Sequence, residues 1–144
     1  MPYNKKITLF AILLAFVVIV FGAYVRLTDA GLGCPDWPGC YGFFGVPESS
    51  ESLSEVEKTF PGQVVEAGKA WREMIHRYIA STLGFLIMVL FGLSLLQRKK
   101  HSEHTSIRLP FYLLMLVAFQ GLLGMWTVTL KVHPVIVSAH LIGG

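Results

Sequence analysis

Residues 7–25 read ITLFAILLAFVVIVFGAYV, an apolar run that contains no charged side chain. Its length is close to the roughly 20 residues that a helix needs to cross the hydrocarbon core of a bilayer. Residues 71–96 and 109–130 contain two further apolar runs of comparable length, so three helices are expected to span a membrane. The sequence therefore predicts an all-α, polytopic membrane protein.

The composition agrees with this class, because 53% of the residues are hydrophobic and only 15% are charged. About 25% of the residues in an ordinary soluble domain are charged. The formal net charge of +3 is accounted for by basic residues next to the apolar runs, and it gives no reason to expect a nucleic-acid partner. The expected surroundings are a lipid bilayer.

A fourth apolar run, residues 134–144, would reach only about 16 Å as a helix, against a hydrocarbon core of roughly 30 Å. We interpret it as the beginning of a fourth transmembrane helix, at about residues 135–144. The chain is then a four-helix transmembrane bundle whose fourth helix is truncated, and we expect it to be a fragment of a longer protein.

Basic residues predict how the chain is oriented in the membrane, since lysine and arginine favour the cytoplasmic side. Lys5 and Lys6 precede the first span. Four more basic residues lie in the short connection between the second and third spans: Arg98, Lys99, Lys100 and Arg108. The amino terminus is therefore expected in the cytoplasm and the long connection, residues 26–70, on the external side.

Two features stand out in this external connection. Cys34 and Cys40 bracket a tight turn on the oxidising side, which predicts a disulfide bond. The disulfide would be either a structural staple for the loop or a redox-active pair that exchanges with a partner thiol. Serine and glutamate residues further along predict a short surface helix over residues 52–59, in a polar segment that would act as a lid or spacer.

Two histidines lie inside predicted spans at matching depth. His76 and His140 each lie five residues from the external end of their helices, about 7.5 Å along the axis. Either one alone would be read as an interfacial or hydrogen-bonding histidine, but the matched pair suits the two axial positions of a haem iron. Helices packed 8–10 Å apart leave no room for a porphyrin, so these two helices should splay or lie across a bundle.

Ionisable residues next to His76 suggest further roles. Glu73 shares a helix face with His76, so its carboxylate could accept a proton or stabilise positive charge beside a haem; otherwise it forms an ion pair with Arg72 or Arg77. Arg77 could hold a haem propionate or extend outward to the interface. Gln120, within the third span, is expected to hydrogen-bond between helices.

Four segments follow one another along the chain: GAYVRLTDAGLGCPDWPGC (22–40), EMIHR (73–77), QGLLGMWTV (120–128) and HLIGG (140–144). In their order and spacing they resemble the amino-terminal half of the bacterial heme A synthase family. The resemblance covers essentially every segment except residues 48–68.

This resemblance implies eight transmembrane helices in two similar four-helix bundles, of which residues 1–144 would be the first. It also implies an oxidoreductase that converts the C8 methyl group of haem O to the formyl group of haem A, for cytochrome oxidase, through an alcohol and a geminal diol. The first bundle would receive haem O as substrate, and the absent second bundle would bind a haem b cofactor. By the same resemblance His76 and His140 are axial ligands, Glu73 is catalytic, and Cys34 and Cys40 are the external cysteine pair.

The implied location is the bacterial inner membrane. The implied partners are haem O, the haem O synthase that makes it and a membrane electron acceptor, while a homo-oligomer is left open. Because the second bundle is missing, we expect these residues alone to be inactive. The alternative function is a b-type haem-binding subunit that only transfers electrons, for which Glu73 would be dispensable.

Overall fold

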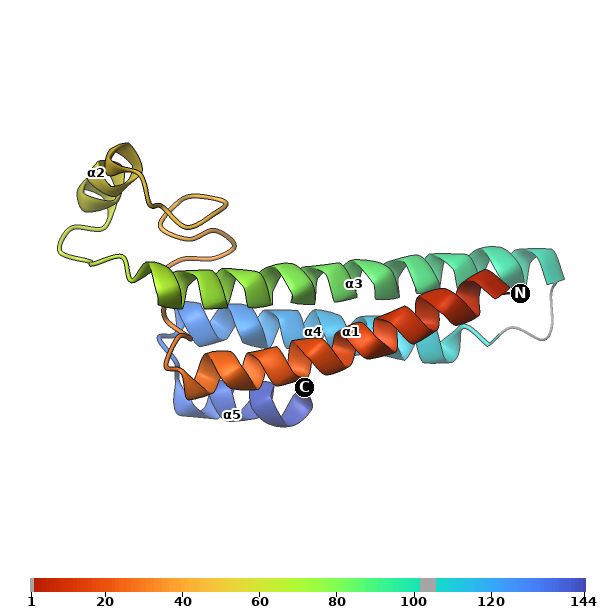
Figure 1. The fold of residues 1–144 in the computed structure, drawn as a ribbon. Helices are drawn as coiled ribbons and strands as arrows, with labels where there is room; N and C mark the ends of the chain where they lie inside the picture. Colours follow the sequence, from red (N-terminus) through yellow and green to blue (C-terminus); the bar gives the residue numbers. More distant parts are fainter. Residues whose placement is uncertain (1, 102–105) are drawn as a thin grey trace.

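The computed structural model describes residues 2–101 and 106–144, and within these ranges the fold is helical with no β-strand. Figure 1 shows the helices of this part of the chain, which are α1 (Pro2–Leu27), α2 (Ser50–Thr59), α3 (Ala67–His101), α4 (Arg108–Thr129) and α5 (Pro134–Gly143). In length and composition, α1, α3 and α4 are apolar enough to cross a membrane. The predicted all-helical class with three spanning helices is therefore confirmed.

The apolar runs located the long helices but not all of their ends. α3 extends beyond the predicted 71–96 on both sides, and α1 extends beyond 7–25 on both sides. A helix can continue through polar residues beyond the apolar layer, because its backbone hydrogen bonds do not require apolar side chains. Hydropathy alone therefore underestimates the length of the helix. α4 and α5 lie within one residue of the predicted bounds.

The helices pack in the order α1 on α3, α3 on α4 and α4 on α5. Over the described residues, no comparably extensive contact joins α3 to α5 or α1 to α5. α1 ends, α3 begins and α5 begins at the same end of the molecule, where α2 also lies (Figure 1). His76 lies on α3 and His140 on α5, two helices that both begin at this end and that make no extensive contact with each other in the described residues.

α2 is attached to the rest of the fold through one buried side chain. The Ser49 hydroxyl caps the helix by accepting a hydrogen bond from the Ser52 amide at 3.1 Å, so α2 begins two residues before the predicted start. Val56 is buried in a core cluster with residues of the disulfide loop and of α3. The segment therefore packs against the fold and is more than a free spacer.

The loop that follows α1 approaches the first turn of α3 very closely at Gly33. A Cβ atom at this position would lie 2.6 Å from the backbone carbonyl carbon of Lys69 and 2.7 Å from the amide nitrogen of Ala70. Backbone atoms cannot move aside as a flexible side chain can. Glycine is therefore required here for the loop to reach α3.

Replacing Gly33 with alanine should force the loop away from α3 and destabilise the protein by about 1–3 kcal/mol. The matched control is Gly31→Ala in the same loop, where a Cβ would meet nothing within 4 Å. The melting temperature of the complete protein in detergent should fall for Gly33→Ala and stay near the parent value for Gly31→Ala. Equal melting temperatures for the two variants would contradict this packing.

Candidate functional site

A disulfide joins Cys34 to Cys40 with an S–S distance of 2.02 Å, which confirms the predicted pair. Both cysteines are completely buried. Inside the closed loop, the Asp36 carboxylate accepts hydrogen bonds from the amides of Tyr41 and Gly42 at 2.6 and 2.8 Å. The loop is thus held by a covalent bond and by its own hydrogen bonds.

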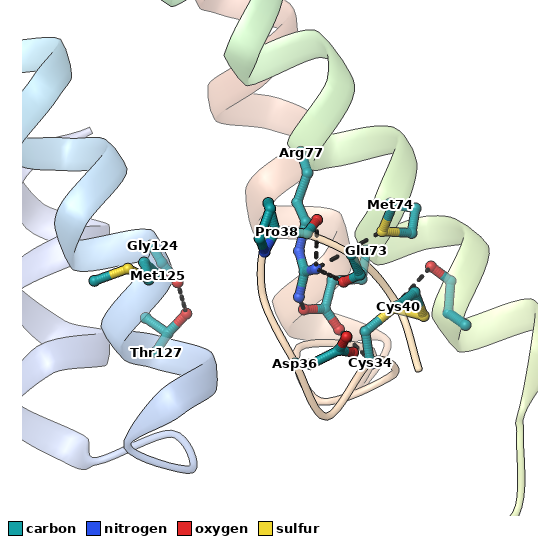
Figure 2. A network of polar contacts seen from close by, with 12 residues as sticks. Cys34, Asp36, Pro38, Cys40, Glu73, Met74, Arg77, Gly124, Met125 and Thr127 are labelled. Atoms are coloured by element: carbon teal, nitrogen blue, oxygen red, sulfur yellow. Dashed lines mark hydrogen bonds and ion pairs between the residues drawn. A yellow bond between two sulfur atoms is a disulfide. The ribbon is translucent and has the colours of Figure 1, made fainter. Parts of the chain in front are cut away.

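Glu73 and Arg77 fasten this loop to α3, and Figure 2 shows the arrangement. Glu73 is only 4% exposed. One of its carboxylate oxygens accepts a hydrogen bond from the Cys34 amide at 3.0 Å, and the other pairs with the Arg77 guanidinium at 2.5 Å. The same guanidinium donates to the backbone carbonyls of Pro38, at 3.3 Å, and Gly39. A buried ion pair therefore bridges the helix and the disulfide loop.

Of the two ion-pair partners considered for Glu73, the structure selects Arg77. Arg72 instead donates from Nε to the Gly68 carbonyl at 2.8 Å, within its own helix. The ion pair does not decide whether Glu73 also has a catalytic role or whether Arg77 also contacts a propionate. Both remain predictions.

Two tyrosines add polar contacts around the loop. The Tyr41 hydroxyl donates to the Val64 carbonyl at 3.4 Å, and the Tyr78 hydroxyl donates to the Phe44 carbonyl. Burial raises the pKa of the Tyr41 phenol above its ordinary value, and the pKa is raised further by the negative charges of Glu66, Asp36 and Glu73. Tyr41 consequently stays protonated near neutral pH and acts as a hydrogen-bond donor.

His76 follows Glu73 on α3 and is held mainly by packing against α1. Its ring stacks on Phe21 with centroids 6.4 Å apart and planes inclined by 17°. A Cβ atom at Gly22 would lie 2.9 Å from the ring, so the imidazole occupies space that only glycine leaves open. Among the described residues, none makes a hydrogen bond to its buried Nδ1 atom. An unsatisfied polar atom in such a place indicates a ligand, an ion or ordered water.

His140 on α5 is held by a hydrogen bond from the neighbouring helix. Its Nδ1 atom lies 2.9 Å from the side-chain oxygen of Gln120 on α4. A Cβ atom at Gly124, also on α4, would lie 3.4 Å from Cε1 and 3.6 Å from Nε2 of the ring. The prediction that Gln120 bonds between helices is confirmed. Its partner was missed, although a single amide in an otherwise apolar helix was the signal that a polar group lies opposite.

His76 lies on α3 and His140 on α5, and these two helices begin at the same end of the molecule. Glu73 and Arg77 lie on the helix that carries His76 and connect it to the disulfide loop. Together, the fold and this site define an all-helical membrane protein whose disulfide loop is bonded to a histidine-bearing helix.

Residues 5–144 match the COX15-CtaA family, which is described as cytochrome oxidase assembly protein, and the chain belongs to this family. It is 50% identical over 128 residues to the heme A synthase of Shewanella oneidensis, covering 89% of this chain and 37% of that protein. It is 32% identical over 137 residues to the heme A synthase of Sinorhizobium fredii, covering 85% of this chain and 35% of that protein.

The chain therefore spans about a third of the length of these curated relatives. No solved structure matches it. The family expected from the four sequence segments is confirmed by these similarities.

The buried ion pair leads to a stability prediction. Arg77→Met leaves the Glu73 carboxylate buried without its cation, which should lower the free energy of unfolding by about 3–5 kcal/mol. The double variant Glu73→Gln/Arg77→Met leaves no unpaired charge and should recover much of that loss. A double-mutant cycle on the complete protein in detergent measures the coupling between the two residues.

Glu66 and Lys69 provide the control, because this pair lies at the start of the same helix with an N···O distance of 3.1 Å but is much more exposed. Its coupling should be below about 1 kcal/mol. If the effects of substituting Glu73 and Arg77 are simply additive, the ion pair does not fasten the loop.

Proposed function

We propose that this chain forms the substrate-binding bundle of a heme A synthase, which oxidises the C8 methyl group of haem O to the formyl group of haem A. Membership of the COX15-CtaA family supports this proposal, as do the two relatives named heme A synthase. The observation that carries it is that His76 and His140 lie on α3 and α5, two helices that begin at the same end and make no extensive contact with each other in the described residues.

The donor set fits haem iron. A porphyrin supplies four nitrogen ligands, so a haem takes one or two axial ligands from the protein, and imidazole is a common one. The amide oxygen of Gln120 can only accept a hydrogen bond, so Nδ1 of His140 carries the proton and Nε2 keeps its lone pair. His76 has a buried ring nitrogen that no described residue satisfies. We assign these two side chains as the axial ligands of the substrate haem.

The chain's own residues then have separate roles in the reaction. His76 and His140 bind and orient haem O so that its C8 methyl group is held in one place. Glu73 supplies a negative charge beside the site, which would stabilise positive charge that develops at the porphyrin rim as electrons are removed. Iron supplies the redox chemistry when haem is bound, and we assign a haem b cofactor to the part of the protein beyond this chain.

Arg77 can serve the substrate as well as the loop. A guanidinium has five N–H donors. Nη2 has a second N–H besides the one on Glu73, so contact with a haem propionate is compatible with the present bonds. The disulfide between Cys34 and Cys40 supports an external, oxidising location for this loop, and therefore a cytoplasmic amino terminus in a bacterial inner membrane.

The proposed partners follow from the reaction. Haem O synthase would supply the substrate, and a membrane electron acceptor would remove electrons. The comparisons do not favour the alternative of a b-type electron-transfer subunit, because the relatives of S. oneidensis and S. fredii are both named heme A synthase.

The function is tested by conversion of haem O to haem A in membranes that contain the complete protein. His76→Ala and His140→Ala should each reduce conversion by more than the roughly 10–100-fold that loss of an outer-shell partner costs. His133→Ala is the matched control, since His133 lies in the turn before α5 and its side chain makes no capping hydrogen bond. Unchanged conversion in both ligand variants would overturn the proposed function.

The role of Glu73 is tested separately by Glu73→Gln, which keeps an oxygen acceptor for the Cys34 amide but removes the charge. We expect haem still to bind, because both proposed ligands are unchanged, and conversion to be slower. Glu66→Gln controls for loss of a carboxylate near the start of the same helix. If Glu73→Gln keeps both the spectrum and full conversion, Glu73 acts only on structure.

A further inference from the structure

The contact between α4 and α5 is built around the His140 ring and contains two glycines. On α4, Gln120 and Gly124 are one turn apart; on α5, His140 and Gly143 are also one turn apart. Gln120 accepts a hydrogen bond from His140 Nδ1 at 2.9 Å, and Gly124 leaves the space on which the ring rests. The four residues therefore interlock the two helices at one point.

Gly143 explains why the Gln120 amide can occupy its position. A Cβ atom at residue 143 would lie 2.0 Å from Nε2 of Gln120 and 3.3 Å from its Cδ atom. Any side chain there would push the amide out of place. The amide is thus confined between the backbone of α5 on one side and the His140 ring on the other.

The two proposed haem ligands are held in different ways. His76 is held by packing against Phe21 and Gly22, and no described residue bonds to its Nδ1 atom. His140 is held by a directed hydrogen bond that determines which of its nitrogens carries the proton. Residues that bond to the outer nitrogen of a ligating histidine orient the ring and raise its basicity.

We propose that Gln120 is a positioning residue for the substrate haem, which keeps His140 in the Nδ1–H tautomer and leaves Nε2 available to the iron. This inference rests on the proposed function, and it names a residue that acts only through His140. Gly143 is required for it, because Gly143 makes room for the amide.

The test measures haem affinity and reduction potential in the complete protein, extracted in detergent. The haem to be followed is the one whose absorption signal is lost in the His140→Ala variant. Gln120→Leu deletes the acceptor, so we expect haem affinity to fall about 10–100-fold. The potential should rise, because a less basic imidazole stabilises ferric iron less well. Gln120→Glu offers a stronger acceptor and should lower the potential, so that the parent protein lies between the two variants.

Gly143→Ala provides a second route to the same effect while Gln120 remains in place. A methyl group there should displace the amide and reproduce the rise in potential seen for Gln120→Leu. The double variant Gln120→Leu/Gly143→Ala should show no further change in potential, because each substitution breaks the same hydrogen bond, the one between Gln120 and His140. Two substitutions on α4 are the controls. Gly121→Ala adds a Cβ that meets nothing within 4 Å. Thr129→Val removes a hydroxyl that bonds only within α4.

The outcomes separate this inference from the proposed function. If His140→Ala removes a haem signal and Gln120→Leu leaves affinity and potential unchanged, Gln120 is not a positioning residue, although the ligand assignment stands. If His140→Ala removes no haem signal, the ligand assignment fails and this inference fails with it. Shifts of opposite sign in Gln120→Leu and Gln120→Glu, with Gly143→Ala following Gln120→Leu, support the proposal.

Discussion

The buried ion pair between Glu73 and Arg77 is the interaction on which the arrangement of the site depends. It joins the disulfide loop to α3 within one turn of His76, and it does so through backbone groups of Cys34 and Gly39. A buried charge without its partner is costly, so the loop and the helix are stable mainly in this joined state. The part of α3 next to His76 is therefore bonded to a loop that a disulfide closes.

The two proposed haem ligands are supported by different helices. The same short stretch of α3 carries a loop anchor and a proposed ligand, whereas α5 carries a proposed ligand whose support comes from α4. Packing limits the orientation of the His76 ring, and a hydrogen bond limits the orientation of the His140 ring. A haem held between them would thus have one side fixed by the shape of α1 and the other by a defined proton position on His140.

The parts of this structure that the sequence predicted are those that depend on local chemistry. Apolar runs predicted the spanning helices, and the external cysteines predicted the disulfide between Cys34 and Cys40. The Glu73–Arg77 pair could be considered in advance because its members are one helical turn apart. The bond from the Cys34 amide to Glu73 and the bond from His140 to Gln120 could not, because they depend on helix rotation and loop path, which a single sequence does not encode locally.

The central claim is that His76 and His140 bind one haem iron from opposite sides. It is tested most directly by a cryo-electron microscopy structure of the complete protein loaded with haem O. Two bonds of about 2 Å to one iron predict that the ligating nitrogens of the two rings lie about 4 Å apart, with the porphyrin between them. A haem iron ligated by only one of these rings, or by another residue of the bundle, would contradict the claim.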